Sequence, residues 1–175
     1  MRRSLNVVNA ANVNFMKRHA STFKADMVKS SLQGWCDAVV AVGKCKTDGG
    51  DTSALATKIL SDAYDYDNGT VLFKPTLTHG EQTFRGTKEG AHAYFVGKNP
   101  KFPNDGGFLL KPWVKCWFTN EKYFLNGPLA VVQCNMHFTS AAGDQIYVDK
   151  SFVFKACDDG KVRLALHHSS LPYKP

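Results

Sequence analysis

The sequence predicts an α+β fold in which helices pack on one curved, mostly antiparallel sheet. The first half of the chain holds segments with apolar residues at helical spacing, whereas from about residue 108 onward the residues alternate as in long strands. Helices followed by an antiparallel meander are typical of this layered class. A chain of 175 residues forms one domain with a sizeable core. We therefore expect a single domain over residues 31–175, preceded by an extension over residues 1–30.

Three helices are expected in the first half. Residues 31–42 predict a helix with Ser30 or Ser31 as N-cap, and Gly43 is expected to end it. Asp51 or Thr52 begins a second helix, which runs to about residue 66 with apolar residues on one face. Residues 88–96 form the third, carrying His92 and Tyr94 behind the N-cap Thr87.

Strands occupy the remainder of the predicted fold. Residues 70–78 read as an extended segment in which Pro75 marks an edge strand or a strand end, because proline lacks an amide donor, and residues 82–85 read as a short strand. Four long strands are expected at about 108–119, 128–140, 145–156 and 161–171. The turns between the long strands contain Asn-Gly, Gly-Asp or Asp-Asp-Gly, which favour hairpins. Helices closing such a sheet into a cone leave a pocket suited to a small ligand.

The basic charge lies mostly at the N-terminus. The net charge falls from +7 to +2 once the five basic residues before Asp26 are set aside, so the body shows no nucleic-acid surface. The acid-free start predicts either an organellar transit peptide or an added helix. We expect an intracellular protein, delivered to a plastid or mitochondrion or else cytoplasmic. No apolar run approaches the about 20 residues of a membrane helix, so no membrane insertion is expected.

The cysteines and histidines do not indicate a metal centre. The five cysteines are odd in number and lack a C-x-x-C pair, which favours reduced core residues over disulfides or a zinc site. The histidines are scattered, and the adjacent His167 and His168 point to opposite faces of a regular strand. We therefore expect no metal ligands.

The last strand ends in His167-His168-Ser169-Ser170, which reads as a site because buried polar atoms need partners. His167 and Ser169 share one face, and His168 and Ser170 share the other. Val162, Leu164 and Leu166 are in phase with His168 and Ser170. If these apolar residues face the core, simple alternation directs the second pair inward and the first pair outward. A bulge, or an apolar outer face used for dimerisation, would instead direct His167 and Ser169 inward.

Several segments together resemble the iota-class carbonic anhydrases, whose cone-shaped fold belongs with the SnoaL-like, nuclear transport factor 2-like and kinase association domains. The resemblance begins near residue 34, and its segments are Phe73–Thr78, Phe84–Phe95, Leu110–Trp113 and, most specifically, His167–Pro172. It implies reversible hydration of CO2 to bicarbonate. It also implies a pocket lined by Thr76, Tyr94, Ser169 and a nearby His167. Metal-independent members of the family need no cofactor, although others are described as manganese-dependent.

The implied chemistry suits these side chains. Hydroxyl groups can orient a water molecule and stabilise the charge that develops on bicarbonate, and a histidine titrates in the range needed to accept a proton. Lys74 and Arg85 are expected to be solvated surface charges. Two other classes stay open: another isomerase or cyclase of this fold, for which Asp149 is the strand carboxylate, or a non-catalytic oligomerisation module. We also expect a homodimer, because the strands carry apolar residues on two faces.

Overall fold

In the computed structural model of the protein, which describes residues 22–173, five strands form one sheet in the order β1-β5-β4-β3-β2. The strands are β1 (Leu72–Lys74), β2 (Trp113–Asn126), β3 (Leu129–Ser140), β4 (Gln145–Ala156) and β5 (Val162–Ser170). The four long strands pair in sequence as an antiparallel meander, whereas β1 joins the edge parallel to β5. The predicted α+β class and the edge position of the proline-bearing segment are confirmed.

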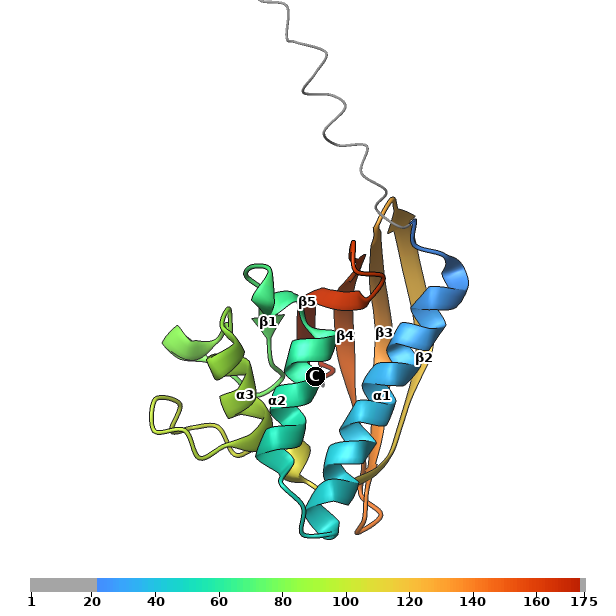
Figure 1. Cartoon of the computed structure of the whole chain (residues 1–175). Helices are drawn as coiled ribbons and strands as arrows, with labels where there is room; N and C mark the ends of the chain where they lie inside the picture. Colours follow the sequence, from blue (N-terminus) through green and yellow to red (C-terminus); the bar gives the residue numbers. More distant parts are fainter. Residues whose placement is uncertain (1–21, 174–175) are drawn as a thin grey trace, which may run out of the picture.

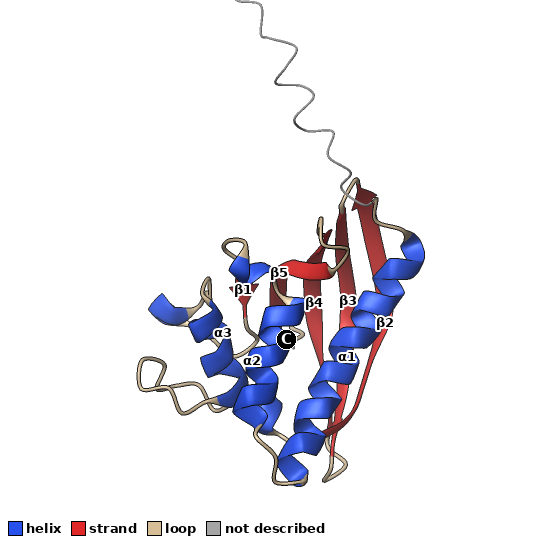
Figure 2. Cartoon of the chain, in the orientation of Figure 1, coloured by secondary structure: helices blue, strands red, loops and turns tan. Residues whose placement is uncertain are grey.

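Three helices cover one face of this sheet. They are α1 (Ala25–Thr47), α2 (Thr52–Ala63) and α3 (Lys88–Val96). Figure 1 shows α1 lying along β2 and β3, with α2 and α3 on the side of β1, and Figure 2 separates the helical layer from the strands. Asp51 caps α2 by accepting the Ala54 amide, and Thr87 caps α3 by accepting the Gly90 amide, as the sequence predicts.

The first helix is longer than predicted at both ends. It begins at Ala25, before the expected caps Ser30 and Ser31, and it continues through Gly43 to Thr47. Gly43 does not end the helix; it lets α1 approach β2. A Cβ atom at Gly43 would lie 2.5 Å from the Trp113 carbonyl oxygen, which is closer than such atoms approach. The glycine thus serves close packing, which sequence pattern alone does not distinguish from a helix stop.

Short 3-10 helices replace some of the regular structure that we predicted. Residues 65–67 turn in this way after α2 ends, and residues 80–82 do so where a strand was expected to begin, leaving 82–85 outside the sheet. Residues 108–110 also form such a turn after Gly107, whose φ is 81°, so β2 begins five residues later than predicted. Of the predicted extension over residues 1–30, residues 1–21 lie outside the described residues, and residues 25–30 belong to α1.

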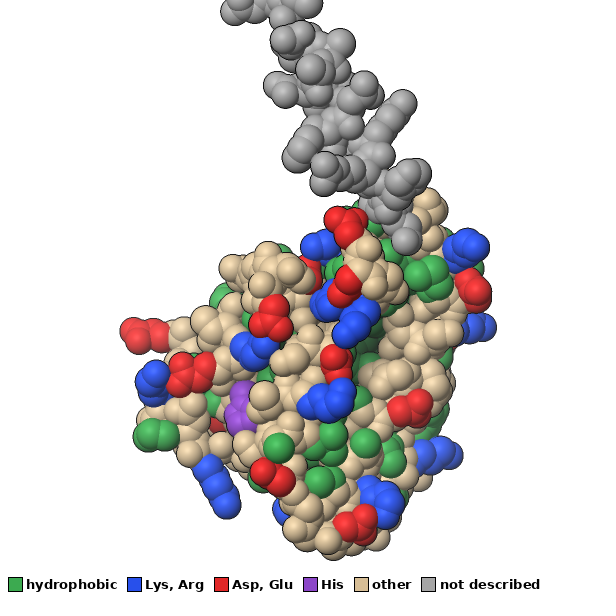
Figure 3. Space-filling view, viewed as in Figure 1, with side chains coloured by type: hydrophobic (Ala, Val, Ile, Leu, Met, Phe, Trp, Pro, Cys, Tyr) green, Lys and Arg blue, Asp and Glu red, His purple; other side chains and the backbone are tan. Residues whose placement is uncertain are grey.

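The core lies between the helices and the inward faces of the strands. Apolar side chains of α1 and α2, such as Leu32, Val39 and Leu60, pack against inward residues of β3 and β4, such as Phe138 and Phe152. The five cysteines are free thiols; four of them are buried, and three of these, Cys36, Cys116 and Cys134, belong to this core. Charges of both signs are scattered over the face seen in Figure 3. Among residues 22–173, no helix has the length and apolar character needed to cross a membrane.

Candidate active site

Two hydroxyl groups that are far apart in the sequence meet at the edge of the sheet. Parallel pairing places Phe73 beside His167 and Lys74 beside His168, so the residues that follow β1 lie next to the end of β5. The Thr76 Oγ1 and Ser169 Oγ atoms are 2.6 Å apart, and either hydroxyl can donate. The side chain of Ser169 is buried. The structure thus brings together two of the four predicted site residues in direct contact.

Lys74 holds the backbone around this hydroxyl pair. Its ammonium donates to the carbonyl oxygens of Thr76 at 3.2 Å and Ser169 at 3.1 Å. Burial lowers the pKa of Lys74. The expectation of a fully solvated lysine was therefore wrong, because the ammonium links the segment after β1 to the end of β5.

Tyr94 reaches the same place from α3. Its hydroxyl is buried and has no hydrogen-bond partner among residues 22–173. Burial raises the pKa of this phenol, and the nearby polar groups of Thr76 and Leu77 counteract the rise. A buried hydroxyl with a free donor is suited to binding a small guest.

Thr76 and Tyr94 line a cavity of about 330 Å³. Its walls are mainly apolar, and they include Phe108, Trp113 and Val148. Asp105 also lines it, but Arg85 forms an ion pair with this carboxylate at 2.8 Å. Arg85 is buried and its guanidinium lies over the Phe102 ring, so the expectation of a solvated Arg85 was wrong. An apolar cavity with a few convergent hydroxyls fits a small molecule of low polarity.

His167 lies behind the hydroxyl pair and is not among the residues that line this cavity. Both of its ring nitrogens have protein partners: Nδ1 lies 2.9 Å from the Tyr64 hydroxyl, and Nε2 lies 2.6 Å from Lys150 Nζ. The Trp35 indole donates to the same Tyr64 hydroxyl at 3.2 Å. Burial, and then the charge of Lys150, hold the pKa of His167 well below its usual range. His167 is thus a neutral ring in a buried polar chain, stacked on Phe73.

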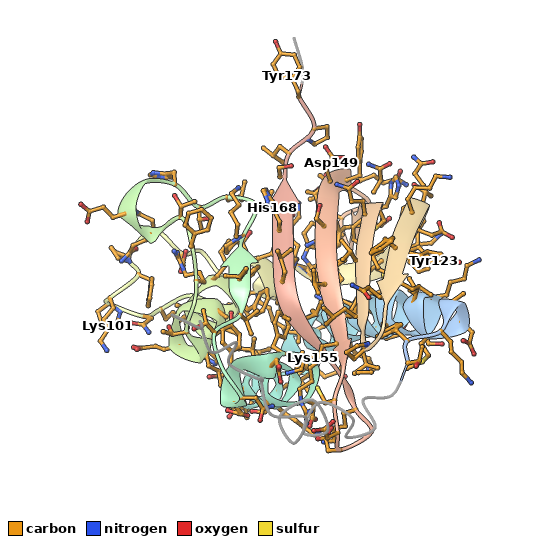
Figure 4. All side chains as sticks on the ribbon, turned by 90° about the horizontal axis from the view of Figure 1, so that it is seen from above. Lys101, Tyr123, Asp149, Lys155, His168 and Tyr173 are labelled. Atoms are coloured by element: carbon orange, nitrogen blue, oxygen red, sulfur yellow. The ribbon has the colours of Figure 1, made fainter. Side chains whose placement is uncertain are left out.

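A β-bulge in β5 resolves the conflict in the strand's alternation. Leu164 pairs with Phe154 and Leu166 pairs with Val153, so two steps along β5 match one step along β4. After this shift His167 and Ser169 are buried, whereas His168 is exposed. Figure 4 shows His168 and Asp149 at the same end of β5 and β4, and Lys155 at the opposite end of β4.

Three other polar residues of the predicted segments have structural roles. The Thr78 hydroxyl donates to the carbonyl oxygens of Pro75 and Thr83 and so closes a turn. His92 Nε2 lies 3.1 Å from the Ser53 hydroxyl, which ties α3 to α2. Asp149 accepts a hydrogen bond from Asn135 and lies only half-buried.

Sequence reasoning missed the partners of His167, which are Trp35, Tyr64 and Lys150. Lys150 had a detectable signal, because it stands in phase with the inward residues Val148 and Phe152 of a strand. A lysine in such a row is either snorkelling or functional. Among residues 22–173, no group of three or more His, Cys, Asp or Glu side chains is arranged to hold a metal ion.

A second cavity, of about 440 Å³, lies between α1 and α2 and is lined largely by apolar side chains. Figure 3 shows hydrophobic side chains in this hollow. Trp35 and Tyr64 contribute to its wall, so the polar chain of His167 ends there. The hydroxyls of Thr76, Tyr94 and Ser169 do not line this cavity, so we place the candidate active site in the first one.

The chain is similar to known proteins of one family. The sequence model of the family described as metal-independent carbonic anhydrase matches residues 26–171. A metal-independent carbonic anhydrase from Nostoc sp. is 43% identical over 149 residues, which cover 84% of this chain and 73% of that protein.

Two solved structures are also similar to this chain. The crystal structure of a cyanobacterial iota-carbonic anhydrase complexed with bicarbonate superposes with a TM-score of 0.86 and 40% identity, covering 88% of this chain and 95% of that one. A putative calcium/calmodulin-dependent protein kinase II association domain from Xanthomonas campestris shares the fold alone, with a TM-score of 0.58 and 19% identity over 90% of this chain and 99% of that one. The extent of the family match and the identity to its curated relative show that this chain belongs to the metal-independent carbonic anhydrases.

Proposed function

We propose that the chain catalyses the reversible hydration of CO2 to bicarbonate without a metal ion, at the cavity lined by Thr76 and Tyr94. Membership in the metal-independent family supports the reaction and the lack of a cofactor. The observation that carries the site is the 2.6 Å contact between Thr76 and Ser169, next to the unpartnered hydroxyl of Tyr94.

The three hydroxyls have the properties that this reaction needs. CO2 is apolar and suits the cavity wall, whereas the bicarbonate that forms is an anion that needs donors. Within the Thr76–Ser169 pair one hydroxyl donates to the other, so the second proton stays available for water or for a bicarbonate oxygen. Tyr94 offers a further donor. Donors placed where negative charge develops stabilise the transition state, as in an oxyanion hole.

Hydration forms a carbon–oxygen bond between water and CO2, and one proton passes from the water to a base in the solvent, because both ring nitrogens of His167 are engaged. A zinc site accelerates this step by lowering the pKa of bound water from about 15.7 to about 7. Hydroxyl donors do not supply that shift, so orientation in a dry cavity must provide much of the acceleration. We therefore propose a slower turnover than that of a zinc hydroxide site. Both ring nitrogens of His167 are engaged, by Tyr64 and Lys150. His167 therefore acts on the hydroxyl groups indirectly, through these two partners, and does not touch the reactants.

The direct test is stopped-flow CO2 hydration with and without a chelator. The wild type should be active after exhaustive chelation, and Tyr94→Phe should lose most of this activity. Tyr123→Phe is the matched control, because Tyr123 is exposed on β2 and does not line the cavity. Loss of activity with chelator and its return with manganese would contradict the metal-free proposal. Activity of Tyr94→Phe equal to that of the wild type would contradict the site.

We also propose a homodimer that uses the sheet face opposite the helices. Trp117, His137 and Tyr147 stack across three strands on that face, with ring centroids 5.0 and 5.5 Å apart. Phe124 and Val131 are exposed beside each other on the same face. Light scattering at micromolar concentration should report a dimer, and Val131→Lys should shift it to monomer. A monomeric wild type would contradict the proposal.

For location, we propose that the chain acts inside the cell, in a plastid or mitochondrion if the basic residues before Asp26 direct import, and in the cytoplasm otherwise. Fusion of residues 1–30 to a fluorescent protein tests this directly. Organellar fluorescence supports import, and diffuse fluorescence supports the cytoplasm.

A further inference from the structure

Lys150 is a buried lysine immediately behind the wall of the candidate active site. It lies on β4 between Val148, which lines the cavity, and Phe152, which packs in the core. It is also the direct cross-strand partner of Ser169 on β5. Side chains of such partners share one face of the sheet, with Cβ atoms about 4.5–5.5 Å apart. Lys150 therefore stands beside the Thr76–Ser169 pair and points into the core.

No anion compensates this ammonium among residues 22–173. Its contacts are His167 Nε2 at 2.6 Å and the face of the Trp35 ring at 4.3 Å. No carboxylate forms an ion pair with it in this part of the chain. A lysine kept in the core without a carboxylate costs stability, which favours a role other than packing.

The other titratable groups that face Lys150 come from every element packed around it. They are thiols of Cys36 on α1, Cys116 on β2 and Cys134 on β3. A hydrogen bond with Cys36, together with burial, raises the pKa of Cys116, and burial raises that of Cys134. Thiols with raised pKa values are uncharged at neutral pH. Tyr64, Lys74 and His168 face the His167 side of the pair and add no negative charge.

The proton of the Lys150–His167 pair resides on Lys150. Burial lowers the pKa of Lys150 to about 7, whereas the pKa of His167 lies well below its usual value. The ammonium therefore donates to Nε2 of a neutral ring, and the Nδ1 proton is directed at the Tyr64 hydroxyl. The positive charge is present below about pH 7 and is lost as the pH rises through that value.

We propose that Lys150, held in place by His167, is an electrostatic positioning residue whose charge favours bicarbonate over CO2 at the Thr76–Ser169 site; this inference rests on the proposed function. The charge is separated from the anion by one side-chain layer, in a region that water screens little. Binding of bicarbonate and protonation of Lys150 then promote each other, because the coupling between two binding events is reciprocal. Lys150 is therefore a neutral amine when CO2 occupies the site and an ammonium when bicarbonate occupies it.

The first test is the KM for bicarbonate in stopped-flow dehydration between pH 6 and 9. In the wild type this KM should rise roughly tenfold over the range, as expected for loss of one nearby charge. Lys150→Met should have a high KM at every pH, and Lys150→Arg a low one, because arginine stays charged. The exposed Lys122→Met on β2 is the control and should keep the wild-type profile. A Lys150→Met protein with the wild-type profile would overturn the proposal and would point to Lys74 instead.

The second test uses the intact wild-type protein and does not depend on turnover. NMR of ¹⁵N,¹³C-labelled lysine should follow the titration of Lys150 with and without sodium bicarbonate. The pKa of Lys150 should rise by roughly one unit when bicarbonate is bound, the same tenfold effect. An unchanged pKa refutes the coupling even if the enzyme is active, whereas an inactive protein whose Lys150 still responds would refute only the proposed function.

Discussion

Replacing Lys150 with methionine should remove about 2 kcal/mol of the pH dependence of stability between pH 7 and pH 9. Burial lowers the pKa of Lys150 from 10.5 to about 7 in the folded protein, and the unfolded chain returns it to its ordinary value. Between these two values the unfolded chain binds the proton more tightly. The wild type therefore becomes more stable as the pH rises, because stability increases wherever the unfolded state holds more protons.

The two pKa values set the magnitude. The burial penalty amounts to about 4 kcal/mol at pH 7 and about 2 kcal/mol at pH 9. Methionine also loses the contact with the Trp35 ring and leaves His167 Nε2 without its partner, but these losses are the same at both pH values. Only the difference between the two pH values isolates the amine.

Urea denaturation followed by tryptophan fluorescence measures this difference. The wild type should gain about 2 kcal/mol more than Lys150→Met between pH 7 and pH 9, and Lys122→Met should behave as the wild type. Parallel pH profiles for the wild type and Lys150→Met would refute the reasoning, because they would mean that the amine has the same pKa in both states.

Three further changes test the site and the fold. Ser169→Ala should lower kcat for CO2 hydration by about 10²–10³ in stopped-flow assays, as loss of one charge-stabilising donor does, whereas the turn residue Thr78→Ala should retain wild-type turnover; equal losses in both would argue against the assignment. His168→Ala should keep near-normal kcat, since its side chain is exposed, and a severe loss would mean that the inward register is the other one. Gly43→Ala should destabilise the protein by about 1–3 kcal/mol in thermal melts, because its Cβ would meet the Trp113 carbonyl, and an unchanged melting temperature would show that α1 moves away freely.

The meander and the helices were predictable because their signals are local. The hairpin turn at Asn126-Gly127, with the glycine φ at 55°, and the caps Asp51 and Thr87 appear where the sequence places them. Gly43 misled because the same residue serves a helix stop and a close approach between elements, and only tertiary structure decides between the two. Apolar periodicity likewise did not predict that α2 ends before the 3-10 turn at residues 65–67.

In the candidate site, too, the sequence predicts some features, whereas others depend on tertiary structure. The resemblance named Thr76, Tyr94, His167 and Ser169, but the contact between Thr76 and Ser169 depends on the pairing of β1 with β5, which alternation patterns do not encode. The bulge between Leu164 and Leu166 could not be predicted from the sequence either, because one additional residue does not change the kind of residues that make up a strand. The role of Lys150 follows only from its neighbours, since charge alone predicts a surface position.

The short length of β1 has a consequence for how the enzyme responds to heat. Thr76 reaches Ser169 across 93 residues of chain through a parallel edge strand of only three residues, reinforced by the two hydrogen bonds of Lys74. Edge segments with few ladder hydrogen bonds open locally at a lower free energy than central strands do. Amide exchange should therefore be faster in β1 than in β3 or β4. On heating, the hydroxyl pair should separate while the meander is still intact, so thermal inactivation should precede the loss of the circular dichroism signal of the sheet.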